Sequence, residues 1–113
     1  MPSDRMRRVN EALKEVLSTH IAGDLRDPRI GFVTLTSVET SPDLRRARVY
    51  VSVLGSEEER ERSLAGLQAS HSRLQSHLAS ELRMKRTPVL EFVYDDSIDT
   101  GMRISGLLEE DES

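Results

Sequence analysis

Two neighbouring strands and the turn between them are encoded by residues 33–55, VTLTSVETSPDLRRARVYVSVLG. In the second half of this stretch every other residue is apolar: Ala47, Val49, Val51 and Val53 alternate with Arg46, Arg48, Tyr50 and Ser52. Such period-2 alternation indicates a strand with one buried face. Because Ser41-Pro42-Asp43 is typical of a turn, the stretch predicts two strands, with the polar set of the second on whichever face the helices leave open.

The first of these strands, which begins near Ile30, contains an irregular step. Its apolar residues change phase between Leu35 and Val38, which lie an odd number of residues apart. We therefore expect an extra residue, a β-bulge, near Ser37 that turns Val38 back toward the core.

A helical pattern precedes the strands. Apolar residues from Met6 to Ile21 recur at three- and four-residue steps, which predicts a helix over about residues 4–20. Ser3 or Asp4 can cap its start, and Gly23 marks its stop.

A second helical pattern follows the strands. Ser56 and Glu59 have the spacing of a capping box, and the pattern then runs to about Met84. An unbroken helix of this length would be about 42 Å long, more than the roughly 34 Å diameter of a globular chain of this size. We therefore expect a kink at Ser70-His71-Ser72, which are poor helix formers.

A third strand, residues 89–94, follows Pro88 and carries Leu90, Phe92 and Tyr94 on one face. The complete order is α-β-β-α-kink-α-β. This order predicts one α+β domain in which helices cover one face of a three-stranded sheet.

Composition limits the function classes. The 113 residues suit one domain, and the absence of cysteine suits a reducing cytoplasm. No apolar run approaches the roughly 18 residues of a membrane span, so we expect no membrane partner. The net charge of -4 is concentrated near the end, since residues 95–113 hold seven acidic residues and one arginine. We expect residues 1–105 to form the folded domain and residues 106–113 to form an acidic, disordered tail.

Cationic residues occur in short clusters that could contact RNA phosphates. The candidate RNA-binding residues are Arg83, Lys85 and Arg86; Arg45, Arg46 and Arg48; Arg5, Arg7 and Arg8; and Ser70, His71, Ser72 and Arg73 at the kink. Each cluster also has a simpler interpretation. The first can compensate a helix dipole, the second can protect a sheet edge, and the third can pair with Glu11 and Glu15.

Catalytic and metal chemistry find little support. His20, His71 and His77 share no ligand spacing, so no metal site is predicted. Asp95, Asp96 and Asp99 could hold magnesium in a hydrolase, but a strand-ending turn beside an acidic tail explains them better. There is no Gly-rich phosphate loop and no nucleophile elbow. We therefore predict a protein without cofactor that is not an enzyme.

Three segments resemble the ribosome-binding factor A family, and the element order resembles a type II K-homology domain. They are residues 33–55; Leu82-Arg83-Met84-Lys85-Arg86 with Pro88 and residues 90–97; and the helix opening Arg5-Met6-Arg7-Arg8-Val9-Asn10 with Asp27-Pro28-Arg29. Many K-homology domains grip the backbone through a GXXG loop, which is absent here. The family has an Ala-X-Gly kink instead, which falls on Ser70-His71-Ser72, where both motif positions are serine.

This resemblance implies a function. It implies a monomeric cytoplasmic factor that binds the immature small (30S) ribosomal subunit at its 16S rRNA. The factor would assist late maturation and 5′-end rRNA processing, and an assembly GTPase would release it. Two alternatives remain open at this point, a protein-interaction adaptor without RNA contact and a magnesium-dependent hydrolase.

Overall fold

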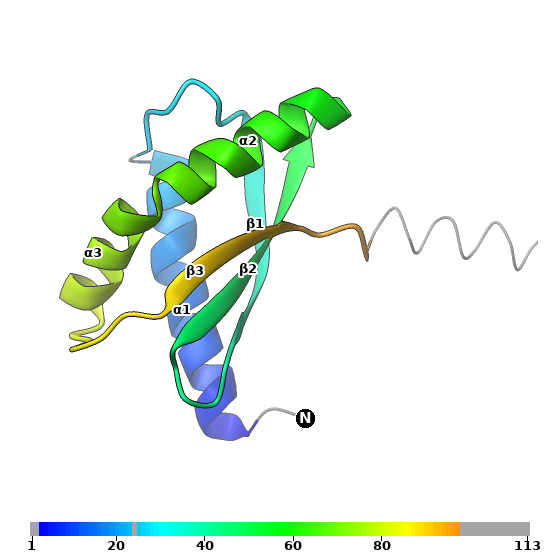
Figure 1. Cartoon of the computed structure of the whole chain (residues 1–113). Coiled ribbons are helices and arrows are strands. Elements are labelled where there is room, and N and C mark those ends of the chain that lie inside the picture. Colours follow the sequence, from blue (N-terminus) through cyan, green and yellow to red (C-terminus); the bar gives the residue numbers. More distant parts are fainter. Residues whose placement is uncertain (1–2, 24, 98–113) are drawn as a thin grey trace, which may run out of the picture.

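The computed structural model describes residues 3–23 and 25–97, and its elements follow the predicted order (Figure 1). The helices are α1 (Asp4–Gly23), α2 (Glu57–Ala69) and α3 (His71–Glu81), and the strands are β1 (Phe32–Thr40), β2 (Arg46–Leu54) and β3 (Val89–Tyr94). The predicted tail at 106–113, the domain boundary at 105 and Asp99 lie outside the described residues.

The strands form one sheet in the order β1-β2-β3. β1 and β2 pair antiparallel, as a tight turn permits, whereas β2 and β3 pair parallel. Parallel neighbours need a long crossover, and α2 and α3 supply it. All the described helices lie on one face of the sheet (Figure 1), as predicted for an α+β domain.

The core lies between that face and the helices. It contains the alternating apolar residues of β2, which are at most 6% exposed, together with leucines from each helix. Helix α1 runs three residues beyond the predicted His20, because Ile21 continues the apolar stripe and packs in the same cluster. Ser3 caps its start, since its hydroxyl accepts the Met6 N–H at 3.2 Å.

The predicted bulge in β1 is confirmed. Leu35 pairs with Val51 and Ser37 with Tyr50, so Thr36 is the extra residue. Val38 is returned to the core and is 5% exposed. Because Thr36 is the bulged residue, its hydroxyl can donate a hydrogen bond to Asp95 Oδ2 at 2.6 Å. This bond links the bulge to the residue that follows β3.

The predicted kink is also confirmed, at Ser70. The Ser70 hydroxyl donates to the Gly66 carbonyl at 2.9 Å, the back-bond that bends helices at serine. The ring of His71 then caps α2, because His71 Nδ1 lies 2.8 Å from the Gln68 carbonyl oxygen. The two helices can therefore follow the sheet instead of leaving it along one straight axis.

The kink places two glutamines along β3, which is an edge strand. Gln68 of α2 donates to the Leu90 carbonyl at 3.0 Å and accepts the Phe92 N–H at 3.3 Å. Gln75 of α3 donates to the Pro88 carbonyl at 2.8 Å. These side chains satisfy backbone groups that an edge strand otherwise leaves open.

Helix α3 ends at Glu81, three residues before the predicted Met84. The Met84 N–H returns to the Ala79 carbonyl at 3.1 Å, and Arg83 has a φ of 53°. This is a Schellman ending, in which the left-handed residue lets the next side chain turn inward. Met84 accordingly packs against the core, and the cations beside it lie on a loop instead of on a helix.

Candidate nucleic-acid interface

The loop between α3 and β3 carries the first predicted cluster. Arg83, Lys85 and Arg86 are all exposed, whereas Met84 between them is partly buried. The far end of the loop is held by Pro88, which is fully buried. Because the loop is anchored at both Met84 and Pro88, its cations point to solvent from a defined backbone.

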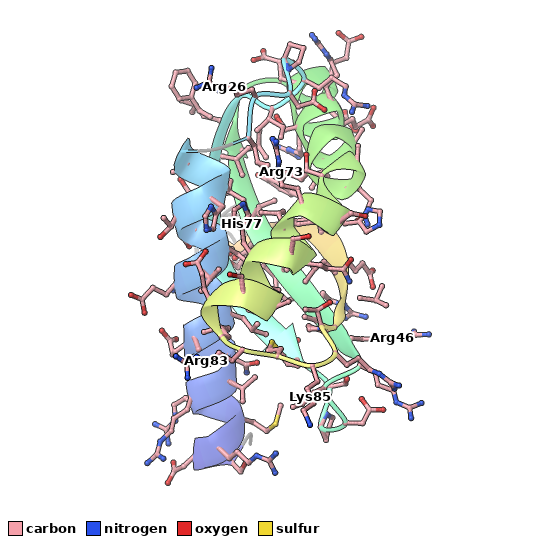
Figure 2. The ribbon with its side chains drawn as sticks, turned by 90° about the vertical axis from the view of Figure 1, so that its left-hand side faces the viewer. Arg26, Arg46, Arg73, His77, Arg83 and Lys85 are labelled. Atoms are coloured by element: carbon pink, nitrogen blue, oxygen red, sulfur yellow. The ribbon has the colours of Figure 1, made fainter. Side chains whose placement is uncertain are left out.

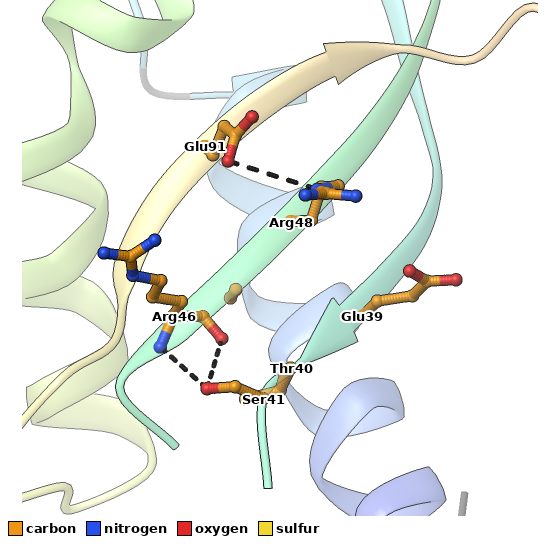
Figure 3. A pocket seen from close by; sticks show the side chains of 7 residues that line it. Glu39, Thr40, Ser41, Arg46, Arg48 and Glu91 are labelled. Carbon is orange, nitrogen blue, oxygen red and sulfur yellow. Dashed lines mark hydrogen bonds and ion pairs between the residues drawn. The ribbon is translucent and has the colours of Figure 1, made fainter. Parts of the chain in front are cut away.

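Arg45, Arg46 and Arg48 form the second predicted cluster, at the start of β2. Arg46 and Arg48 are exposed on the open face of the sheet, as the alternation predicts. The backbone of Arg46 is held by Ser41, whose Oγ accepts its N–H at 3.1 Å (Figure 3). Arg45 is part of the turn, and its Nε lies 4.0 Å from Asp43 Oδ2.

Carboxylates balance the charge of Arg48. Its cross-strand partners are Glu39 on β1 and Glu91 on β3, and Arg48 Nε lies 4.0 Å from Glu91 Oε2 (Figure 3). A hydrogen bond with Tyr50, and further the nearby Glu91 and Glu39, raise the pKa of Arg48. The open face therefore has mixed charge around Arg48, which weakens its attraction for phosphate.

The third predicted cluster begins α1. Arg5, Arg7 and Arg8 are all exposed. Arg7 pairs with Asp4, not with the Glu11 expected from helical spacing. Asp4 also lies in the first turn, where a carboxylate favours the helix dipole.

One apolar hollow brings these three clusters together. It has a volume of about 300 Å³, and its lining includes Arg8 of α1, Leu44 of the β1–β2 turn, and Leu82 and Met84 after α3. Each of these four residues lies in or next to one of the clusters. Segments that are far apart in sequence therefore present their cations at the same end of the molecule.

The fourth predicted group lies at the kink. Ser70 and His71 are engaged in the local hydrogen bonds described above, and Ser72 Oγ lies 3.2 Å from His71 Nε2. Arg73 is different, since it lines a second hollow of about 360 Å³ with Gly23, Arg26 and His77. Figure 2 shows that Arg73 and Arg26 lie on the same side of the molecule as Arg83 and Lys85.

The sequence did not indicate Arg26 or His77 as candidate residues. Arg26 follows α1 and His77 lies on α3, so they come together only because these two helices pack. No local pattern signals this contact. The position of Arg26 just beyond the end of α1 is a weak signal, because basic residues are common after helix ends.

The structure also changes the interpretation of the histidines. No ligand spacing was predicted among His20, His71 and His77, but the rings of His20 and His77 stack with centroids 3.5 Å apart. Glu81 pairs with both of them. Sequence spacing does not reveal this contact, because it depends on the packing of α1 on α3.

Among the predicted acidic residues, Asp95 has a structural role. One carboxylate oxygen bonds Thr36 and the other accepts the Ser97 N–H at 2.9 Å. The hydrogen bond with Thr36, followed by those with Ser97, lowers the pKa of Asp95. A magnesium ion would have to replace these bonds, which favours the turn over the hydrolase.

Asp27 organises the loop that follows α1. Its carboxylate bonds the Arg29 side chain, at 2.6 Å to Nη2, and the Arg29 backbone N–H at 2.9 Å. The hydrogen bonds with Arg29 lower the pKa of Asp27 to about 2. This loop packs closely against α2 at Gly66, where a Cβ would lie 2.7 Å from the Ile30 side chain.

The fold and these surfaces define a small α+β module of K-homology topology, with exposed cations on loops and along a helix. Residues 5–108 match the family described as ribosome-binding factor A. The chain belongs to this family. Within residues 3–23 and 25–97, no helix is long and apolar enough to cross a membrane.

Individual relatives agree with this assignment. The chain is 44% identical over 110 residues to ribosome-binding factor A of Brevibacillus brevis, covering 97% of this chain and 91% of that protein. The crystal structure of ribosome-binding factor A from Thermus thermophilus is similar, with a TM-score of 0.69, 34% identity, and coverage of 79% of this chain and 94% of that one. A Thermus thermophilus homology model fitted into a cryo-EM map of a 30S–factor complex has a TM-score of 0.64, 34% identity, and coverage of 77% and 91%.

Proposed function

We propose that this chain is a ribosome-assembly factor that binds the immature small ribosomal subunit through its 16S rRNA. It assists late maturation and processing of the 5′ end, and it makes or breaks no covalent bond itself. Family membership supports this proposal, as does the fit of the Thermus thermophilus factor into a map of a 30S complex.

The observation that carries the proposal is the gathering of exposed cations around the α3–β3 loop. Arg83, Lys85 and Arg86 project from a loop that is anchored in the core. Phosphate contacts of this kind fix position and orientation without reading sequence. They suit a protein that recognises the shape of a folded rRNA.

Arg73 and Arg26 extend this interface along α3 toward the second hollow. Arg46 and the arginines that begin α1 contribute from the same end of the molecule. We assign Arg48 a smaller share, because Glu39 and Glu91 flank it. Ser70, His71 and Ser72 act mainly by setting the direction of α3 and hence the place of Arg73.

The mechanism is a population shift. A protein that binds one arrangement of the rRNA better than the mature arrangement increases the population of the first by its difference in affinity. Release then requires a partner or a maturation step that removes this preference, and we assign that role to an assembly GTPase. The factor acts in the cytoplasm as a monomer.

Residues 1–105 form the RNA-binding domain in this proposal, and the acidic residues 106–113 lie outside it. Four carboxylates at 109–112 repel phosphate, so they limit binding to RNA in general. The domain then binds firmly only where many cations meet the rRNA together.

The test is sedimentation of the purified protein with purified ribosomal subunits through sucrose at low and moderate salt. We expect the protein to migrate with small subunits and not with large ones, and to favour immature over mature small subunits. Equal binding to both subunits would indicate non-specific attraction to RNA. Binding to small subunits that is unaffected by salt would favour the adaptor that contacts only protein.

A further inference from the structure

Three side chains on the helical side, outside the cationic clusters described above, could hold a metal ion. His20 comes from α1, and His77 and Glu81 come from α3. His77 and Glu81 are four residues apart, so helical geometry places them on the same face. The packing of α1 on α3 then brings His20 against both.

The distances fit one shared ion. One ligand atom from each residue lies within 4.8 Å of the other two, and His77 Nδ1 lies 3.6 Å from Glu81 Oε2. With bonds of about 2.0–2.1 Å, the ligand atoms of a tetrahedral zinc ion lie roughly 3.3 Å apart. The cluster is therefore close to the required size before any ion binds.

Binding requires a modest rearrangement. The two imidazole rings stack at an interplanar angle of 12°, so their in-plane lone pairs run side by side and do not converge. His20 Nε2 also pairs directly with Glu81 Oε2. Rotation of one ring would direct both nitrogens at the ion, and the proton of the His20–Glu81 pair would be released.

The surroundings suit an open site. The His20 side chain is 12% exposed, that of His77 31% and that of Glu81 45%, so water can complete the coordination. Two imidazoles and one carboxylate are a ligand set that zinc uses in proteins, and imidazole also suits nickel, copper and cobalt. Arg26 and Arg73 line the hollow next to His77 and lower the affinity for any cation.

We propose that His20, His77 and Glu81 form a binding site for a divalent transition-metal ion of the zinc class, which links α1 to α3. The ion binds the folded protein only, since the ligands are 57 residues or more apart between the two helices. Such an ion stabilises the native state, and it fixes α3 relative to α1 beside Arg73.

Thermal unfolding of the untagged protein, with ZnCl₂ or with EDTA, tests this proposal. We expect zinc at about 100 times its dissociation constant to raise Tm by on the order of 10 °C, and EDTA to reverse the change. His77→Gln and Glu81→Gln should each reduce the affinity for zinc at least about tenfold. Cobalt should give visible absorption bands with the unmodified chain that both variants weaken.

Glu11→Gln is the matched control for Glu81→Gln, because Glu11 is an exposed carboxylate on α1 and is not one of the three ligands. It should leave the zinc response unchanged. A zinc response that survives in the His20→Gln, His77→Gln double variant would overturn the proposal, as would one that Glu11→Gln removes. Tm in EDTA shows whether each variant is folded, so a loss of folding is not mistaken for a loss of the site.

Discussion

The α3–β3 loop allows a quantitative prediction about binding to RNA. Within the described part of the chain, Arg83, Lys85 and Arg86 take part in no ion pair. All three charges are therefore available to phosphate. Each neutralised phosphate contributes about 0.7–0.9 to the slope of log affinity against log salt, because counterions are released.

Replacing all three by glutamine should lower this slope by about two. Between 50 and 200 mM salt, a slope difference of two changes the affinity ratio of wild type to variant by roughly 16-fold. The loss should be uniform across rRNA sequences, because phosphate contacts carry no base information. The fold should be retained, since all three side chains are exposed.

Fluorescence anisotropy with purified small subunits measures this slope. The chain has no cysteine, so Thr34→Cys, exposed on the open face of β1, gives one labelling position away from the loop. Arg48→Gln is the control for the single change Arg83→Gln, and it should alter the slope less because carboxylates flank Arg48. An unchanged slope in the triple variant would refute the reasoning, and a sequence-selective loss would indicate base readout.

Further predictions concern the body of the protein and its acidic end. Gly66→Ala should destabilise the fold by about 1–2 kcal/mol in urea unfolding, because the new methyl group meets Ile30 and the gain in helix propensity offsets only part of that. Gly23→Ala should leave the free energy of unfolding unchanged, since no atom lies within 4 Å of a Cβ there. Equal losses of stability in Gly23→Ala and Gly66→Ala would contradict the packing argument. The lowered pKa of Asp27, about 2 in the folded state against an ordinary 3.8, gives stability that is present above pH 3.8 and lost as pH falls toward 2. Wild type should therefore lose more stability than Asp27→Asn between pH 4 and pH 2, and parallel curves would contradict this. Removing residues 109–113 should leave Tm within a degree or two and raise the affinity for free RNA, and a larger loss of Tm would show that these residues pack.

Local patterns in the sequence were sufficient for the strands and the kink. The alternation in β2 specifies its buried face, and the odd step from Leu35 to Val38 specifies the bulge. The back-bond of Ser70 follows from the chemistry of serine in a helix. These features depend on residues within a few positions of one another, so the sequence expresses them directly.

Features that depend on tertiary packing were not predictable in this way. The stacking of His20 on His77, and the presence of Arg26 and Arg73 in the lining of one hollow, depend on the position of α1 against α3. Likewise the sequence gives no reason to expect Gln68 on the edge of β3. The early end of α3 depends on Met84, whose burial favours a left-handed residue before it.

In the proposed complex, the helical side near the α3–β3 loop faces 16S rRNA. Site-specific photo-crosslinking in the complex with small subunits tests it most directly, since each introduced cysteine is unique in this chain. A probe at Ser80→Cys, exposed on the last turn of α3, should crosslink to 16S rRNA, whereas one at Thr34→Cys on the open sheet face should not. Crosslinks from Thr34→Cys alone, or from Ser80→Cys to ribosomal proteins and never to RNA, would contradict the account.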